Sequence, residues 1–289
     1  MLQLSCSESN QIETQIEQYC TLSGTIYRIY RNTVITGAKI EIGNKVDSSD
    51  SQGKYKIENV TEGKITLTVT KHDYTTFETQ LTLSSGDTTF NIGLTKYCPP
   101  TVTIDGQVYN TVKIGDQCWI KENLNVGTMI QGNQQTTDNG IVEKYCYNDD
   151  EANCETYGAL YQWDELMNYS TENGAQGICP DGWHLPTEAD FQHLLSLVDY
   201  DGNSLKHTSQ GYGGGKSTNT SGFSALLAGS TFNDGTFHNL GRAGLFWSST
   251  DRSHPVYSIY FILDNNTNRA LFNSTYKISG LCVRCLKND

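Results

Sequence analysis

Short segments that alternate polar and apolar residues occupy the first third of the chain, and this pattern excludes most folds. Turn signals such as Asp50-Ser51-Gln52-Gly53 and Glu62-Gly63 separate the segments. Alternation places every second side chain on one face of a strand, and evenly spaced short strands are typical of two packed sheets. The sequence therefore predicts an all-β sandwich over residues 20–97. Its strand-like segments are residues 23–30, 38–42, 53–60, 63–70, 76–83 and 88–94.

A change of pattern marks a second domain. Residues 98–103, CPPTVT, are an expected linker, because consecutive prolines stiffen and extend the chain. Strand-like patterns follow at residues 107–115 and 117–124, and the chain is again rich in strands and turns from residue 222. We therefore expect a second domain over residues 98–289.

Two stretches in the middle of this domain have helical spacing. In residues 158–170 and 186–200, apolar residues recur every three or four positions. Thr187 followed by Asp190 is a capping-box pattern at the start of the second stretch. The predicted fold is therefore a β-sandwich followed by an α+β domain with two helices and a C-terminal hairpin. The apolar residues of the second helix are Phe191, Leu194, Leu195 and Val198.

The net charge of −12 excludes several kinds of partner. Nucleic acid and anionic lipid both attract basic surfaces, so we expect no nucleic-acid partner. No apolar run approaches the roughly 20 residues of a membrane-spanning helix, so membrane contact is expected only through a lipid anchor. Nine cysteines in a Gly- and Tyr-rich chain indicate an oxidising compartment, in preference to a cytosolic protein with buried thiols.

The first residues, MLQLSCSESN, lack the charged and apolar regions of a complete signal peptide. They resemble the end of a bacterial lipoprotein signal, in which the cysteine carries the lipid. This interpretation assigns lipidation to Cys6 and a tether to residues 1–19. It predicts a protein on the bacterial outer-membrane surface or in the extracellular space. Gln3 stands where Leu is usual, so an accidental likeness stays open.

The first domain resembles a known family through three motifs: SGTIY, DSQGKY and GKITLTV. Together they are similar to the carboxypeptidase regulatory-like domain, a transthyretin-like sandwich. The resemblance covers about residues 21–95 and implies a spacer without chemistry. Cys20 and Cys98 flank the domain, so a disulfide that closes it is an expectation, although pairing cannot be read from sequence.

Six stretches of the second domain occur in the order of another family. They include IGDQCWIKENLNVGTMI, GICPDGWHLPTEADFQHLL and GLCVRCLKND, and they cover about residues 101–287. Together they resemble the Fibrobacter succinogenes major paralogous domain. That resemblance implies a C-type-lectin-like fold, shared with formylglycine-generating enzymes. It also implies a disulfide between Cys179 and Cys285.

The other cysteines of the second domain leave two expected pairs. Cys146 and Cys154 enclose a short acidic loop, YNDDEAN, which is an expected solvated loop in preference to an ion site. Cys118 and Cys282 are then left for each other. Each such disulfide stabilises a loop-rich domain by about 2–4 kcal/mol, because it restricts the unfolded chain.

Candidate catalytic motifs are weak. The stretch GYGGGKST, residues 211–218, fails as a phosphate-binding loop because Gln210 stands where the first glycine is needed, so we expect a flexible surface loop. Residues three apart on a strand point to opposite faces, so Cys282 and Cys285 favour two separate disulfides over a redox pair. His184 is expected to pack and hydrogen-bond before a helix. The calcium-ligating motifs of sugar-binding lectins are absent, so we expect no metal and no cofactor.

The C-terminal region predicts a hairpin with its turn at Asp264–Asn268. One face is expected to bury the core, and the other to carry Tyr, Asn, Arg, Phe and Ser, the residues typical of recognition surfaces. The alternative is ordinary strand packing. The predicted ligand-binding residues are Trp247, Arg252, His254, Ser258, Tyr260, Ile262, Asn265, Asn268, Arg269, Phe272 and Tyr276.

The sequence thus predicts a monomeric, non-enzymatic surface lipoprotein that binds a protein or carbohydrate ligand. Residues 251–279 also look like a segment diversified by a retroelement, in which adenines are rewritten between fixed flanks. One alternative is an oxidase of the formylglycine-generating type, which would need free thiols at Cys282 and Cys285. The other is a structural envelope or fimbria-like component, which would self-associate.

Overall fold

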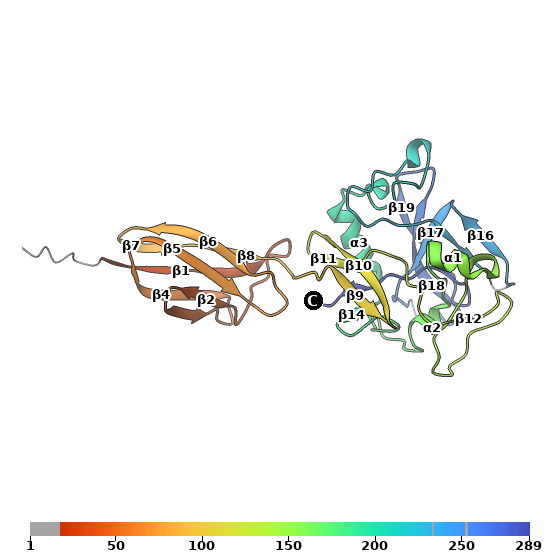
Figure 1. Ribbon diagram of the computed structural model, residues 1–289, viewed down its shortest axis with the longest axis horizontal. Coiled ribbons are helices and arrows are strands. Elements are labelled where there is room, and N and C mark those ends of the chain that lie inside the picture. Colours follow the sequence, from red (N-terminus) through yellow and green to blue (C-terminus); the bar gives the residue numbers. More distant parts are fainter. Residues whose placement is uncertain (1–17, 233, 252–253) are drawn as a thin grey trace, which may run out of the picture. The chain divides into compact units, whose positions relative to one another are not determined.

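The structure, a computed structural model, describes residues 18–232, 234–251 and 254–289 (Figure 1). The chain divides into two units, one ending at Thr95 and the other beginning at Lys96. The first unit consists of β-sheets, and the second is an α+β unit with few helices. No helix among the described residues is long and apolar enough to cross a membrane. Cys6, the predicted lipidation site, lies outside the described residues.

Eight strands form two sheets in the first unit. In one sheet β1 lies between β4 and β7 and also pairs with β8; the other has the order β3-β2-β5-β6. Apolar side chains from both sheets share one core, so the unit is a β-sandwich. The strands are β1 (Tyr19–Arg28), β2 (Lys39–Ile42), β3 (Lys45–Ser48), β4 (Lys54–Thr61), β5 (Gly63–Thr70), β6 (Phe77–Leu83), β7 (Gly86–Thr89) and β8 (Ile92–Leu94).

Five of the six predicted segments each match one strand, and the sixth, residues 88–94, covers the end of β7 and all of β8. β3 (Lys45–Ser48) was not predicted because its residues, KVDS, are too few and too polar to show a pattern. The DSQG turn has a clear local cause. The Asp50 carboxylate accepts hydrogen bonds from the backbone N–H groups of Gln52 and Lys54. Gly53 has a φ of 73°, a conformation that favours glycine.

The second unit contains three sheets and three α-helices within its described residues. The larger sheets have the orders β14-β20-β11-β10-β9 and β16-β15-β17-β18-β19, and β12 pairs with β13. The helices are α1 (Glu151–Tyr157), α2 (Trp163–Leu166) and α3 (Glu188–Leu197). The strands are β9 (Thr101–Ile104), β10 (Gln107–Ile114), β11 (Gln117–Ile120), β12 (Thr128–Met129), β13 (Glu143–Lys144), β14 (Trp183–His184), β15 (Ala228–Thr231), β16 (Phe237–Leu240), β17 (Ala243–Trp247), β18 (Tyr257–Asp264), β19 (Ala270–Tyr276) and β20 (Leu286–Lys287).

The capping box at α3 is confirmed. The Thr187 hydroxyl accepts a hydrogen bond from the Asp190 backbone N–H at 3.1 Å, and the Asp190 carboxylate accepts one from the Thr187 N–H at 2.9 Å. The helix places Phe191, Leu194 and Leu195 in the core, as its spacing predicts.

Two other expectations for this unit are wrong. The helix predicted over 158–170 shrinks to the single turn α2, because Leu160 and Tyr161 pair in extended conformation with Tyr145 and Leu281. The predicted linker 98–103 contains most of β9, which pairs with β10.

Two apolar clusters form the interior of the second unit. We call the first the tryptophan core, because it holds Trp163, Trp183 and Trp247. The second, the phenylalanine core, holds Phe191, Phe223, Phe246 and Phe261 together with Trp119. Neighbouring residues of β17 enter different cores, since side chains on a strand alternate between its two faces. The sheet that contains β17 and β18 is therefore buried on both faces.

Three disulfides join Cys98 to Cys118, Cys146 to Cys154, and Cys179 to Cys285. The last two are the expected pairs. Because structural disulfides persist in oxidising compartments, they indicate an extracytoplasmic location.

The expected pairs Cys20–Cys98 and Cys118–Cys282 are wrong. Cys20 lies inside the core of the first unit, where its thiol contacts the Val60 carbonyl. Cys98 is bonded to Cys118 instead. Cys118 belongs to the tryptophan core and Cys282 to the phenylalanine core, so their thiols do not meet. Cys20 and Cys282 are both buried free thiols.

Candidate functional site

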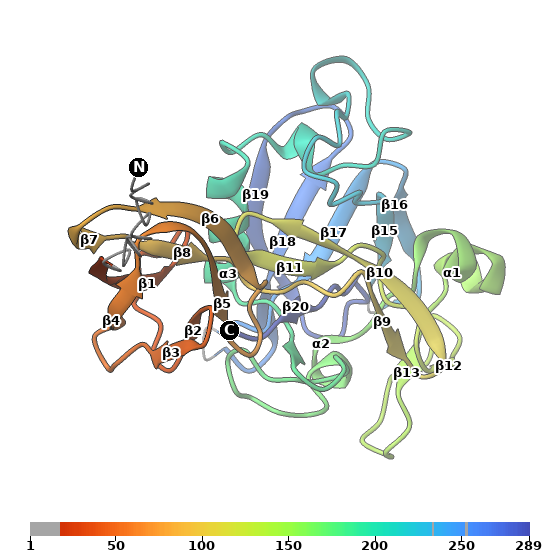
Figure 2. The ribbon, with the colours of Figure 1, turned by 60° about the vertical axis from the view of Figure 1, so that its left-hand side comes forward.

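The predicted hairpin is present and consists of β18 and β19. The strands pair antiparallel from Tyr257 opposite Tyr276 to Leu263 opposite Ala270. On its other side β18 pairs with β17, so β19 is the edge strand of the sheet. Figure 2 shows α3 beside β18 and β19. This arrangement leaves the two ends of the hairpin and the outer strand available to a ligand.

The middle of the hairpin is closed on both faces, which corrects the expectation of one fully exposed face. On one side Phe261 stacks on Phe191 of α3, with ring centroids 4.8 Å apart. On the other side Tyr260 meets Trp247 edge to face at 6.4 Å. Tyr260 is only 9% exposed and Trp247 only 1%, so neither can contact a ligand as predicted.

Ser258 is also buried, and its hydroxyl donates a hydrogen bond to the Thr250 carbonyl at 3.1 Å. The FWSST segment, residues 246–250, explains this burial. The Trp247 indole N–H donates to the Tyr161 carbonyl at 2.8 Å, and the Ser249 hydroxyl donates to the Leu185 carbonyl at 2.9 Å. These residues hold the sheet in place, so Trp247 and Ser258 are structural.

At the open end of the hairpin, three aromatic rings form a surface row that we call the aromatic ladder: His254, Tyr257 and Tyr276. The His254 and Tyr257 ring centroids are 4.7 Å apart, and those of Tyr257 and Tyr276 are 4.5 Å apart. Tyr276 is 44% exposed, and the neighbouring Val256 is 45% exposed. A hydrogen bond between the two phenols raises the pKa of Tyr257. The sequence did not predict Tyr257 as a site residue, because only the strand pairing shows that Tyr276 lies directly opposite it.

A buried lysine fixes the base of the ladder. The Lys277 backbone N–H donates to the Val256 carbonyl at 2.8 Å. Its ammonium lies 3.0 Å from an Asp251 carboxylate oxygen and 4.1 Å from the centre of the Trp163 ring. Charge pairing and a cation–π contact thus tie the chain beside the ladder to the tryptophan core.

At the turn end of the hairpin, a polar hollow of about 660 Å³ opens to the surface. This volume falls within the range of about 300–1,000 Å³ that is usual for small-molecule sites. Ile262 and Asn265, both predicted site residues, line it. Among the described residues, the lining consists of Tyr212, Asn239, Arg242, Ala243, Ile262, Asp264, Asn265 and Asn266.

The ammonium of Lys206 holds the hairpin turn beside this hollow. Lys206 is completely buried, and its Nζ donates to the carbonyls of Gly215, Asp264 and Thr267 at 2.6, 2.8 and 2.9 Å. Burial lowers its pKa. The carbonyls come from two segments, so a single cation joins the 211–216 loop to the hairpin turn.

The GYGGGKST loop lies at the surface, as expected, and its backbone is packed on the turn. The Tyr212 N–H donates to the Asn265 carbonyl at 2.7 Å. A Cβ atom on Gly215 would collide with the backbone of Asn265 and Thr267, so this glycine permits the close approach.

The remaining predicted residues lie apart from both surfaces or play structural roles. Phe272 packs against Phe261 with centroids 5.5 Å apart, next to the phenylalanine core. The Asn268 carbonyl accepts a hydrogen bond from the Gly202 N–H at 2.8 Å. Arg269 is exposed beyond the turn. Arg252 lies outside the described residues.

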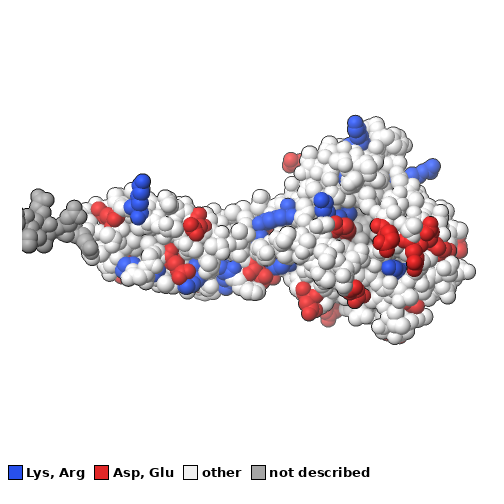
Figure 3. Space-filling model, in the orientation of Figure 1, with Lys and Arg blue, Asp and Glu red and all other residues white. Residues whose placement is uncertain are grey.

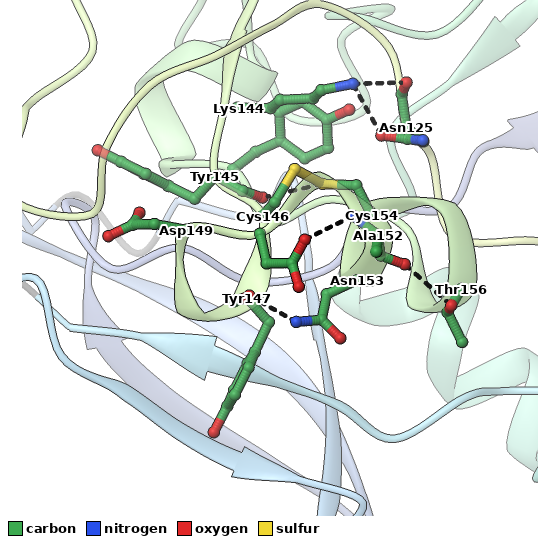
Figure 4. The surroundings of a disulfide bond; sticks show 12 residues. Asn125, Lys144, Tyr145, Cys146, Tyr147, Asp149, Ala152, Asn153, Cys154 and Thr156 are labelled. Carbon is green, nitrogen blue, oxygen red and sulfur yellow. Dashed lines mark hydrogen bonds between the residues drawn. A yellow bond between two sulfur atoms is a disulfide. The ribbon is translucent and has the colours of Figure 1, made fainter.

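The acidic loop between Cys146 and Cys154 largely forms a helix start (Figure 4). The Asp150 carboxylate caps α1 at the Ala152 N–H, and the Asp149 carboxylate accepts from the Gly132 N–H at 2.7 Å. Acidic side chains gather over this segment (Figure 3). Within the described ranges, no group of three or more His, Cys, Asp or Glu residues is arranged to hold a metal ion.

His184 packs before α3 as expected. Its ring contacts the Asn288 amide oxygen at 2.8 Å and the Asp190 carboxylate at 3.4 Å. Burial alone would lower the pKa of His184, but these hydrogen bonds outweigh it and raise the pKa. Burial alone would raise the pKa of Asp190, but its hydrogen bonds with His184 and Thr187 lower it.

The cysteine pair near the C-terminus does not form a dithiol. Cys285 is bonded to Cys179, and burial raises the pKa of the Cys282 thiol to about 12. Such a thiol is almost fully protonated at neutral pH and is therefore a poor nucleophile.

Comparison with known proteins gives one strong match. The family model described as the Fibrobacter succinogenes major domain matches residues 112–287, which is more than half of the chain. No curated protein matches the chain. The N-terminal β-sandwich lies outside the matched residues.

Solved structures resemble only part of the chain. A type II cohesin–X-dockerin complex from Acetivibrio cellulolyticus matches at 24% identity and a TM-score of 0.25, covering 30% of this chain and 63% of that chain. A Bacteroides uniformis protein whose carbohydrate binding is itself inferred matches at 12% identity and a TM-score of 0.24, covering 35% and 50%. Both cover less than two thirds of the matched chain, and scores this low support no argument about function.

Proposed function

Because the chain belongs to the Fibrobacter succinogenes major domain family, we propose that it is a non-enzymatic bacterial surface protein that binds a protein or glycan through its C-terminal hairpin. A lipid on Cys6 anchors it to the outer membrane. The first unit is a carboxypeptidase regulatory-like, transthyretin-like spacer. The second is a C-type-lectin-like recognition domain that acts as a monomer.

The aromatic ladder carries this proposal. Exposed aromatic side chains that form a contiguous patch often mark contact sites, because they bury large areas with few rotatable bonds. Tyr276 and Val256 are nearly half exposed although they lie beside a well-packed sheet. The disulfide at Cys285 and the burial of Cys282 further favour a binding scaffold over an oxidase that needs two reactive thiols.

Diversification of residues 251–279 would act only through its exposed positions. Ile259, Phe261 and Leu263 are buried, so their replacement would unfold the domain instead of changing its ligand. A near-repeat downstream of the gene should therefore differ at adenines in codons of exposed residues, such as Asn273 and Tyr276. Sequencing of the flanking DNA tests this, and absence of any such repeat removes the retroelement from the proposal.

Binding is tested with the full chain on arrays of glycans and of purified bacterial and host surface proteins. The variant with Tyr257→Ser and Tyr276→Ser should bind its ligand at least tenfold more weakly, since aromatic anchors commonly contribute more than about 1.4 kcal/mol. Tyr97→Ser is the matched control, because Tyr97 is a similarly exposed tyrosine outside the hairpin. Unchanged binding of the double variant would contradict the proposal.

A further inference from the structure

We propose that the polar hollow at the hairpin turn binds the ring of a neutral sugar without a metal ion. This inference rests on the proposed function and specifies its ligand class at one end of the hairpin. The hollow has the volume of a small-molecule site, and its lining comes from the 211–216 loop, the β16–β17 turn and the β18–β19 turn.

Amide side chains supply the first argument. Asn239, Asn265 and Asn266 each carry a donor group and an acceptor group on one short side chain. The Asn265 amide donates to the Gly241 carbonyl at 3.0 Å, which fixes its orientation. Among the described residues none hydrogen-bonds the side chains of Asn239 or Asn266. Adjacent hydroxyl groups of a sugar need donors and acceptors side by side, and these amides provide them.

The charges of the lining favour a neutral ligand. Arg242 contributes a guanidinium and Asp264 a carboxylate, and the described part of the lining contains no other charged side chain. A free anion would be attracted by Arg242 and repelled by Asp264, whereas hydroxyl groups can donate to the carboxylate and accept from the guanidinium. Apolar contact for the C–H face of a sugar is available from Ile262 and from Tyr212, which is 62% exposed.

The Lys206 ammonium makes a metal ion unnecessary. A divalent cation in a loop site is typically held by carbonyl and carboxylate oxygens. Here three carbonyls already surround the ammonium group of Lys206, and this contact holds together two of the three segments that line the hollow. The shape of the site is therefore set before a ligand arrives and does not depend on calcium.

The test is saturation-transfer NMR of the full chain with methyl glycosides of glucose, galactose, mannose and N-acetylglucosamine, and with methyl glucuronide. At least one neutral glycoside should show transfer, and EDTA should leave it unchanged. The variant with Arg242→Ala and Asn266→Ala should reduce the transfer at least fivefold. Lys216→Ala is the control, because Lys216 is exposed on the same loop without lining the hollow.

Three outcomes would overturn the inference: transfer to no neutral glycoside, transfer that the double variant leaves intact, or transfer that EDTA abolishes. Transfer to the glucuronide alone would equally reject a neutral ligand. The ladder variant at Tyr257 and Tyr276 separates the two proposals. If it abolishes array binding while the hollow variant has no effect in either assay, the proposed function stands and the sugar site in the hollow is wrong.

Discussion

Cys282 and Cys285 are three residues apart, yet their side chains lie in different cores. Cys282 is buried in the phenylalanine core, whereas Cys285 joins Cys179 in the tryptophan core. This relationship determines the redox state of the C-terminal pair, and it can be measured directly.

Among the described cysteines, we expect the unreduced protein to contain two free thiols, at Cys20 and Cys282. Both are buried, and desolvation raises the pKa of each, so iodoacetamide should leave them unmodified in the native state. After unfolding in guanidinium without reductant, peptide mass spectrometry should find alkylation at these two positions. Alkylation of Cys98 or Cys285 would contradict the pairing.

Removal of the Cys179–Cys285 disulfide should destabilise the protein more than removal of Cys146–Cys154. The first closes a separation of 106 residues and the second one of 8. In the chain-entropy model these loops contribute about 5 and about 2.5 kcal/mol. Urea unfolding of the two double Cys→Ala variants measures the order, and a larger loss for the shorter loop would contradict this account.

Lys206→Met should lower the free energy of unfolding by about 3 kcal/mol or more, because it leaves three buried carbonyls without their donor. Lys216→Met is the matched control, since this neighbouring lysine is exposed, and we expect a change within about 0.5 kcal/mol. Chemical unfolding measures both. Equal stabilities would mean that the ammonium does not hold the turn.

Stability should fall as the pH rises above about 6.5 through the deprotonation of His184. Its folded-state pKa lies above the ordinary value of 6.5, so its contribution is complete below that value and is lost as the pH passes through the raised pKa. Asp190 has a lowered pKa, so its contribution is present above 3.8 and is lost at more acidic pH.

The measurement is the thermal midpoint of unfolding between pH 5 and pH 8.5. His184→Gln keeps a hydrogen-bonding group but does not titrate, so it should flatten the decline on the alkaline side. His207→Gln is the control, because His207 contacts Ser209 and no carboxylate. An identical decline in the His184 variant would assign the pH dependence to another group.

Local patterns in the sequence predicted the elements that a short stretch of residues identifies by itself. The capping box of Thr187 and Asp190, the strands of the sandwich and the turn at Asp264–Asn268 all follow from residues within a few positions of each other. Helical spacing misled at residues 158–170, where Leu160 and Tyr161 pair with distant partners. The spacing of apolar residues indicates which side chains are buried. It does not indicate whether the backbone hydrogen bonds are made within a helix or with a distant segment.

The sequence by itself determined the class of each domain, the presence of the hairpin and the segment that contains the aromatic ladder. Only the tertiary structure decided which hairpin residues reach solvent, since α3 covers one face at Phe261 and the tryptophan core covers the other at Tyr260. It also decided the disulfide pairs and the contact of Lys206 with Thr267, 61 residues away. Burial and pairing depend on distances in space, and a one-dimensional pattern carries only the distances along the chain.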